Sequence, residues 1–197
     1  TAYHIPLLVT IAGELNPACF VEALRMLARR HEALRTAIAA DAGTPTQKLL
    51  ASLDIPVSIV DAGEATDEAE LGSIARSMLS EAARETFDLN TGPLCRLTLL
   101  KAGPERWFAL FVVHHIVFDG WSIRVLLEDW SELYAALAEK REPDLPELTV
   151  QQADHAAWQH HYLDTPAYHD QIAYWTSPGP FTRPGPGPWR KRGWTSN

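Results

Sequence analysis

Cysteine, long apolar runs and basic side chains are all scarce in this chain of 197 residues. The two cysteines, Cys19 and Cys95, stand apart in apolar surroundings, which argues against a disulfide framework and favours reduced core thiols in a cytoplasmic protein. No apolar run approaches the roughly 20 residues that a membrane-spanning helix needs. Acidic residues outnumber Lys and Arg by 25 to 17, which argues against nucleic acid or an anionic membrane as the main partner.

What the chain does contain is enough apolar material for a core, with 46% hydrophobic residues and seven tryptophans. Apolar periodicity predicts strands over residues 3–13, 36–40, 47–51, 57–60, 94–101 and 107–113, and helices over 17–31, 66–86, 122–140, 150–163 and 166–175. Strands and helices mix without strict alternation, so we predict an α/β fold built as an α+β layered sandwich. Three acids of the helix predicted over 122–140, Glu128, Asp129 and Glu132, are expected to form a solvated face.

The most informative stretch joins the apolar strand 107–113 to the helix that follows it. It contains two adjacent histidines, His114 and His115, then Asp119 and Gly120. A histidine titrates near neutrality, so His115 can accept or donate a proton with little tuning. A carboxylate in an apolar loop is costly unless a cation or several donors satisfy it, which favours an arginine partner for Asp119. Gly120 permits a sharp turn or a close approach to a ligand.

Two other interpretations of this stretch stay open on the residues alone. Both histidines can be ordinary loop residues, with Asp119 capping the following helix. A metal site is a weaker alternative, because His115 and Asp119 offer two ligands but no cysteine or third ligand stands at a familiar spacing. The residues alone do not decide among these interpretations.

The stretch His114–Gly120 matches the HHxxxDG signature of the condensation domains of nonribosomal peptide synthetases, which make antibiotics and other secondary metabolites. Three further segments follow the family's order. Arg30–Thr36 resembles its RHExLRT motif, Phe87–Leu94 its FDLxxGPL segment and Gln152–Trp158 its YxDFAxW motif, in which Gln152 and His155 replace the usual aromatics. The resemblance covers residues 1–175 and implies the N-terminal half of a condensation domain, a single lobe of the chloramphenicol-acetyltransferase-like fold.

The resemblance also implies a reaction and its partners. The amine of an acceptor aminoacyl group attacks the thioester of a donor acyl or peptidyl group. Both substrates are attached to the phosphopantetheine arms of peptidyl carrier domains. An adenylation domain is the expected neighbour, and a C-terminal lobe is expected to complete the tunnel.

The resemblance assigns roles to six residues. His115 hydrogen-bonds the amine as base or positioner, His114 shapes the loop and Gly120 admits the substrate. An arginine, Arg30 or Arg35, pairs with Asp119.

Residues 176–197 differ in character from the rest, with nine Gly or Pro and no acid. This composition predicts a disordered tail. None of the family's later motifs appears there, so we expect a truncated lobe over 1–175 that is inactive by itself. Alternatives are a coenzyme A-dependent acyltransferase of the same superfamily and a non-catalytic remnant that docks carrier domains.

Overall fold

The computed structural model describes residues 3–41, 43–51, 54–63, 68–82 and 84–176. The chain divides into two units at residues 153 and 154, and each unit is described by itself. The prediction of a disordered tail falls on residues that, apart from Thr176, lie outside the described ones.

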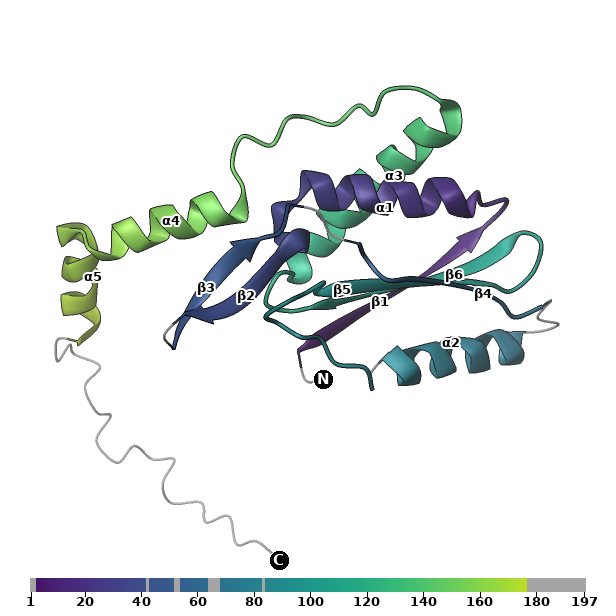
Figure 1. Cartoon of the computed structure of the whole chain (residues 1–197), viewed down its shortest axis with the longest axis horizontal. Helices are drawn as coiled ribbons and strands as arrows, with labels where there is room; N and C mark the ends of the chain where they lie inside the picture. The colour runs from purple at the N-terminus through teal and green to yellow at the C-terminus, as the bar shows by residue number, and fades with distance from the viewer. Residues whose placement is uncertain (1–2, 42, 52–53, 64–67, 83, 177–197) are drawn as a thin grey trace, which may run out of the picture. The chain divides into compact units, whose positions relative to one another are not determined.

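A four-stranded sheet in the order β1-β6-β5-β4 forms the centre of the first unit (Figure 1). Its strands are β1 (His4–Ala12), β4 (Val57–Asp61), β5 (Cys95–Lys101) and β6 (Arg106–His114). Strand β6 pairs antiparallel with both β1 and β5, and β4 runs parallel to β5. The register places His4 opposite His114, so the start of β1 lies beside the end of β6.

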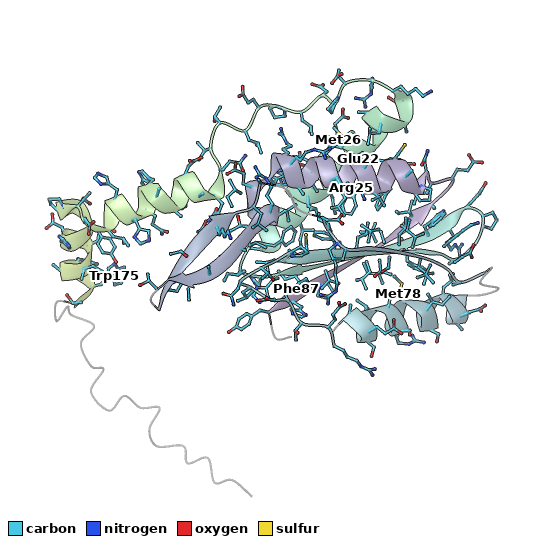
Figure 2. All side chains as sticks on the ribbon, in the orientation of Figure 1. Glu22, Arg25, Met26, Met78, Phe87 and Trp175 are labelled. Atoms are coloured by element: carbon cyan, nitrogen blue, oxygen red, sulfur yellow. The ribbon has the colours of Figure 1, made fainter. Side chains whose placement is uncertain are left out.

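Helices cover both faces of this sheet. Helices α1 (Pro17–Arg30) and α3 (Gly120–Glu139) lie on one face and α2 (Glu68–Ala82) on the other (Figure 1). Side chains of β6 alternate between the two layers, because successive residues of a strand point to opposite faces. Ala109, Phe111 and Val113 pack under α1 and α3, whereas Phe108, Leu110 and Val112 join the cluster that contains Met78 of α2 (Figure 2).

Local sequence explains where α1 starts and stops. Asn16 caps the helix by accepting hydrogen bonds from the backbone N–H groups of Ala18 and Cys19, and Pro17 takes the first helical position. After α1 a short 3-10 helix, η1 (Glu32–Arg35), leads into a separate hairpin of β2 (Thr36–Asp41) and β3 (Thr44–Leu49). This hairpin lies apart from the main sheet, as its own two-stranded sheet.

Two further helices, α4 (Gln152–Leu163) and α5 (Pro166–Thr176), contain no buried residue. No helix of the described residues is long and apolar enough to cross a membrane. The predicted mixed α/β fold is confirmed, and the predicted strands and helices are present with small shifts at their ends. The most consequential shift concerns α3, which begins at Gly120 instead of 122 and so makes Asp119 its cap.

Candidate active site at the end of strand β6

The loop between β6 and α3 is held by backbone hydrogen bonds at its start. The N–H of Val117 donates to the carbonyl oxygen of His114 at 3.1 Å, which closes a turn. The N–H of His115 donates to the carbonyl oxygen of Tyr3 at 2.7 Å. The loop is therefore anchored to the first residues of the chain as well as to its own strand.

His114 points into the structure behind this turn. Its Nδ1 atom accepts a hydrogen bond from the backbone N–H of Ile116 at 3.1 Å. Its ring lies edge to face with the rings of His4 and Phe87, at centroid distances of 6.0 and 6.3 Å. Burial, with a smaller effect of the neighbouring His115, lowers the pKa of His114. A neutral ring that accepts at Nδ1 and packs against aromatics is a support for the turn.

His115 points the other way and is exposed. Its ring lines a pocket of about 220 Å³, whose other walls come from Ala33, Ile116, Val117, Phe118, Asp119, Ser122 and Gln152. Within the part of the chain that the structure describes, no hydrogen bond engages the His115 ring. Both ring nitrogens are thus available to a ligand in this pocket.

Asp119 acts as the N-cap of α3. Its Oδ1 atom accepts hydrogen bonds from the N–H of Ser122 at 2.9 Å and from the Ser122 hydroxyl at 2.7 Å. The Ser122 Oγ in turn accepts from the N–H of Asp119 at 3.3 Å, which completes a capping box. These hydrogen bonds, first that of the Ser122 side chain, lower the pKa of the exposed Asp119 carboxyl.

The expected pairing of Asp119 with Arg30 or Arg35 is wrong. Arg30 donates from Nε to Asp129 at 2.9 Å, and Arg35 donates from Nη1 to the carbonyl oxygen of Leu50 at 2.8 Å. The physical reason is that the first turn of α3 already supplies donors to an exposed carboxylate, whose charge also suits the helix N-terminus. The alternative interpretation of Asp119, as a helix cap, is the correct one.

Asp129 is the structural residue near this site that sequence reasoning missed. It was expected on a solvated face, but it is 9% exposed and accepts at Oδ2 from Arg30 and also contacts Nε2 of His31 at 2.7 Å. The spacing of the apolar residues in this helix could have predicted the burial of Asp129. Asp129 lies three residues after Leu126 and four before Leu133, on the buried stripe of α3. The arginine and histidine of the RHExLRT-like segment therefore brace α1 against α3.

Gly120 is the first residue of α3, and its φ angle is not positive. The left-handed backbone conformation, which favours glycine, is therefore not used at this position. Open space lies where a Cβ would stand. A close approach of a ligand to this backbone stays a prediction.

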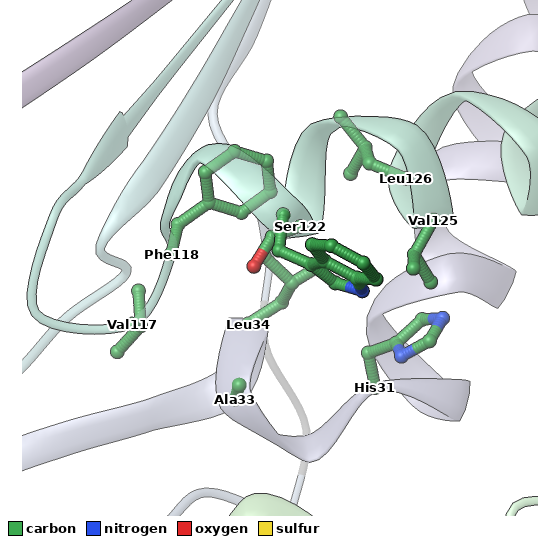
Figure 3. A pocket seen from close by; sticks show the side chains of 9 residues that line it. His31, Ala33, Leu34, Val117, Phe118, Ser122, Val125 and Leu126 are labelled. Atoms are coloured by element: carbon green, nitrogen blue, oxygen red, sulfur yellow. The ribbon is translucent and has the colours of Figure 1, made fainter.

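A second pocket adjoins the first and shares Ala33, Val117, Phe118 and Ser122 with it. Figure 3 shows Val117 and Phe118 from the loop, Val125 and Leu126 from α3, and His31 and Leu34 from the segment after α1. Its volume is about 150 Å³, and its rim includes Trp121, which is 78% exposed. Across the described residues, no group of three His, Cys, Asp or Glu side chains could hold a metal ion.

Residues 1–178 match the family model of the Condensation domain. The chain belongs to the condensation domain family. A linear gramicidin synthase of Brevibacillus parabrevis is 38% identical to this condensation domain chain over 176 residues, which are 89% of this chain and 3% of that protein. The dimodular nonribosomal peptide synthase of Bacillus subtilis is 38% identical over 182 residues, covering 88% of this chain and 7% of that protein. The resemblance that the four motifs indicated is thereby confirmed.

Solved structures agree on the fold. The starter condensation domain of the rhizomide synthetase RzmA has a TM-score of 0.77 at 23% identity, and the match covers 88% of this chain and 41% of that one. The X-domain in its complex with OxyB from teicoplanin biosynthesis has a TM-score of 0.75 at 29% identity, covering 88% of this chain and 37% of that one. This chain thus spans less than half of these structures, and its fold corresponds to a single lobe of a condensation domain.

Proposed function

We propose that this condensation domain chain provides the His115 site for amide bond formation in nonribosomal peptide synthesis. The observation that carries the proposal is the placement of His115. Its ring is exposed, free of hydrogen bonds within the described residues, and lines a pocket with the capped Asp119. The relatives that are peptide synthetases supply the reaction class.

In the proposed reaction, the nitrogen of an acceptor aminoacyl group attacks the carbonyl carbon of a donor thioester. The C–N bond forms, the C–S bond breaks, and the proton lost by the amine ends on the released thiol. His115 accepts a hydrogen bond from the amine, as general base or as positioner, which orients the nitrogen lone pair toward the carbonyl. The open space at Gly120 leaves room for the acyl group beside the backbone.

The partners follow from the reaction. Donor and acceptor substrates arrive on the phosphopantetheine arms of two peptidyl carrier domains, so this chain binds no cofactor of its own. We place an adenylation domain beside it and a C-terminal lobe over the His115 pocket and the pocket that adjoins it. Ile116 of the first pocket is 48% exposed, and Trp121 of the second is 78% exposed. The two free cysteines suit the cytoplasm.

The test is a chimera in which residues 1–175 replace the matching segment of the related condensation domain in the Bacillus subtilis dimodular synthase. The chimera is mixed with loaded donor and acceptor carriers, and the amide is measured by mass spectrometry in a single turnover. We expect product that falls at least about a hundredfold in His115→Ala, as general base catalysis typically contributes. His160→Ala, at an exposed position of α4, is the matched control and leaves the rate unchanged.

Two outcomes separate the proposal from its rivals. Near-normal product from His115→Ala contradicts the assigned role. Acyl transfer from coenzyme A thioesters in place of carrier thioesters indicates the acyltransferase alternative. The unmodified chain by itself gives no product, because its exposed His115 faces water, which weakens the contacts that orient the amine.

A second candidate is a docking module, which the likeness to the X-domain bound to OxyB favours. That structure pairs a domain of this fold with a partner protein. In this case the chain binds a carrier domain or another protein, and no variant of the chimera forms amide. Titration calorimetry with purified carriers, together with the single-turnover assay, distinguishes the two functions.

A further inference from the structure

The segment that leads into α4 is fastened to the end of α1 by one side chain. The Gln151 amide donates from Nε2 to the carbonyl oxygen of Arg30 at 3.0 Å and accepts at Oε1 from the N–H of Glu32 at 3.2 Å. Its partners lie 121 and 119 residues earlier in the chain. Arg30 itself is fixed by the buried Asp129 and donates to the carbonyl oxygen of Pro146.

This attachment determines the position of the next residue, Gln152. Gln152 lines the same pocket as His115, together with Asp119 and Ser122. The Ser122 hydroxyl and Oδ1 of the Asp119 carboxylate are bonded to each other in the capping box. Gln152 is exposed, and within the described ranges its amide has no hydrogen-bond partner. The pocket therefore offers a ligand an imidazole and a carboxamide beside the Asp119 carboxylate.

These two groups complement each other chemically. A neutral imidazole accepts a hydrogen bond from an amine, and a carboxamide N–H donates to a carbonyl oxygen. The other walls of the pocket are the apolar side chains of Ala33, Ile116, Val117 and Phe118. A substrate that presents an amine to one group and a carbonyl to the other fits this arrangement.

We propose that Gln152 is a substrate-binding residue, whose side-chain amide donates a hydrogen bond to a carbonyl oxygen of the acyl group held beside His115. The inference rests on the proposed function, because it takes the ligand to be an acyl thioester. A packing role does not account for Gln152, which is exposed. The two Gln151 hydrogen bonds hold the backbone next to Gln152, which reduces the backbone entropy that is lost when Gln152 binds a ligand.

The experiment uses the full chain, labelled with nitrogen-15, and the N-acetylcysteamine thioester of N-acetyl-L-leucine as the probe. Nuclear magnetic resonance follows the side-chain NH₂ signals of Gln152 and the ring signals of His115 during a titration. Both sets are expected to shift with one dissociation constant. Gln47, exposed on β3, is the internal control and does not shift.

Variants test whether the amide donor matters. Gln152→Glu and Gln152→Met keep the length of the side chain and remove its N–H donors, so each is expected to weaken probe binding about threefold to tenfold, the worth of one hydrogen bond. Gln47→Glu and Gln47→Met are matched controls with unchanged affinity. The backbone spectrum of each variant reports that the fold is retained.

The outcomes separate this inference from the proposed function. If His115 shifts while Gln152 does not, or if both Gln152 variants bind as tightly as the parent chain, the inference is overturned and the proposed function stands. If neither residue responds to the probe, the inference is overturned, and the chimera assay decides the proposed function separately. If Gln152→Glu alone weakens binding, its charge explains the loss, and the donor role is refuted.

Discussion

The Nδ1 atom of His114 accepts a hydrogen bond from the backbone N–H of Ile116 at 3.1 Å, so the first histidine of the signature fixes the turn that exposes the second. Because Nδ1 is an acceptor here, the proton of the neutral ring lies on Nε2. The adjacent His4 ring has its own buried Nδ1 without a partner among the described residues. Both imidazoles are therefore suited to the neutral state.

Stability is expected to fall as the pH decreases through 6.5, the ordinary pKa of histidine. Burial is the main cause that lowers the pKa of His4 and His114 in the folded chain, so the unfolded chain binds more protons below that pH. The stabilisation is complete above 6.5 and decreases toward the folded pKa values. Thermal unfolding between about pH 7.5 and about pH 5.5 measures this slope. An equally steep slope in the His4→Gln/His114→Asn double variant would contradict the assignment.

Removing the cap of α3 is expected to cost little. Asp119→Ala loses the hydrogen bonds from Ser122 and should destabilise the chain by about 1 kcal/mol, the usual worth of an N-cap. Asp119→Ser retains a capping oxygen and should lose less. Urea unfolding measures both. A loss several times larger for Asp119→Ala would point to a buried ion pair, which Asp119 does not form with any of the described residues.

Asp129→Ala is expected to be the more damaging change, with a loss of about 3 kcal/mol, because it leaves the partly buried Arg30 without its carboxylate. The matched control is Glu128→Ala, one residue earlier, which removes only an exposed pair with Arg124 and should stay within about 0.5 kcal/mol. Urea unfolding of the two variants under identical conditions measures the difference. Equal stabilities would show that the Arg30 contact contributes nothing.

The two thiols are expected to react with iodoacetamide at different rates. Burial raises the pKa of Cys95 to about 12, so almost no thiolate forms at neutral pH, and the side chain is 0% exposed. Cys19 is only partly buried and should be alkylated first. Mass spectrometry of tryptic peptides, with and without urea, measures both sites. Rapid labelling of Cys95 in the folded chain would contradict its place under α1 and α3.

Much of the fold follows from local patterns. The apolar run along β6 and the apolar stripe of α3 could be predicted from the sequence, because each depends only on the periodicity of a single strand or helix. The place of the histidine pair in a strand-to-helix loop followed for the same reason. The motifs added the family, and with it the expectation that His115 faces a ligand.

The hydrogen-bond and ion-pair partners of individual side chains could not be predicted from the sequence in the same way. The sequence by itself indicated that Asp119 needs donors, and both a helix cap and an arginine were compatible with that need. The tertiary structure decided between them, because it pairs Arg30 with Asp129 and Arg35 with Leu50, and the start of α3 leaves the Ser122 donors to Asp119. Likewise Arg30 and Asp129 stand 99 residues apart, and Gln152 stands far from His115 in the chain. Such pairings depend on how α1 packs against α3 and on where Gln151 fastens the following segment, and no local period encodes those placements.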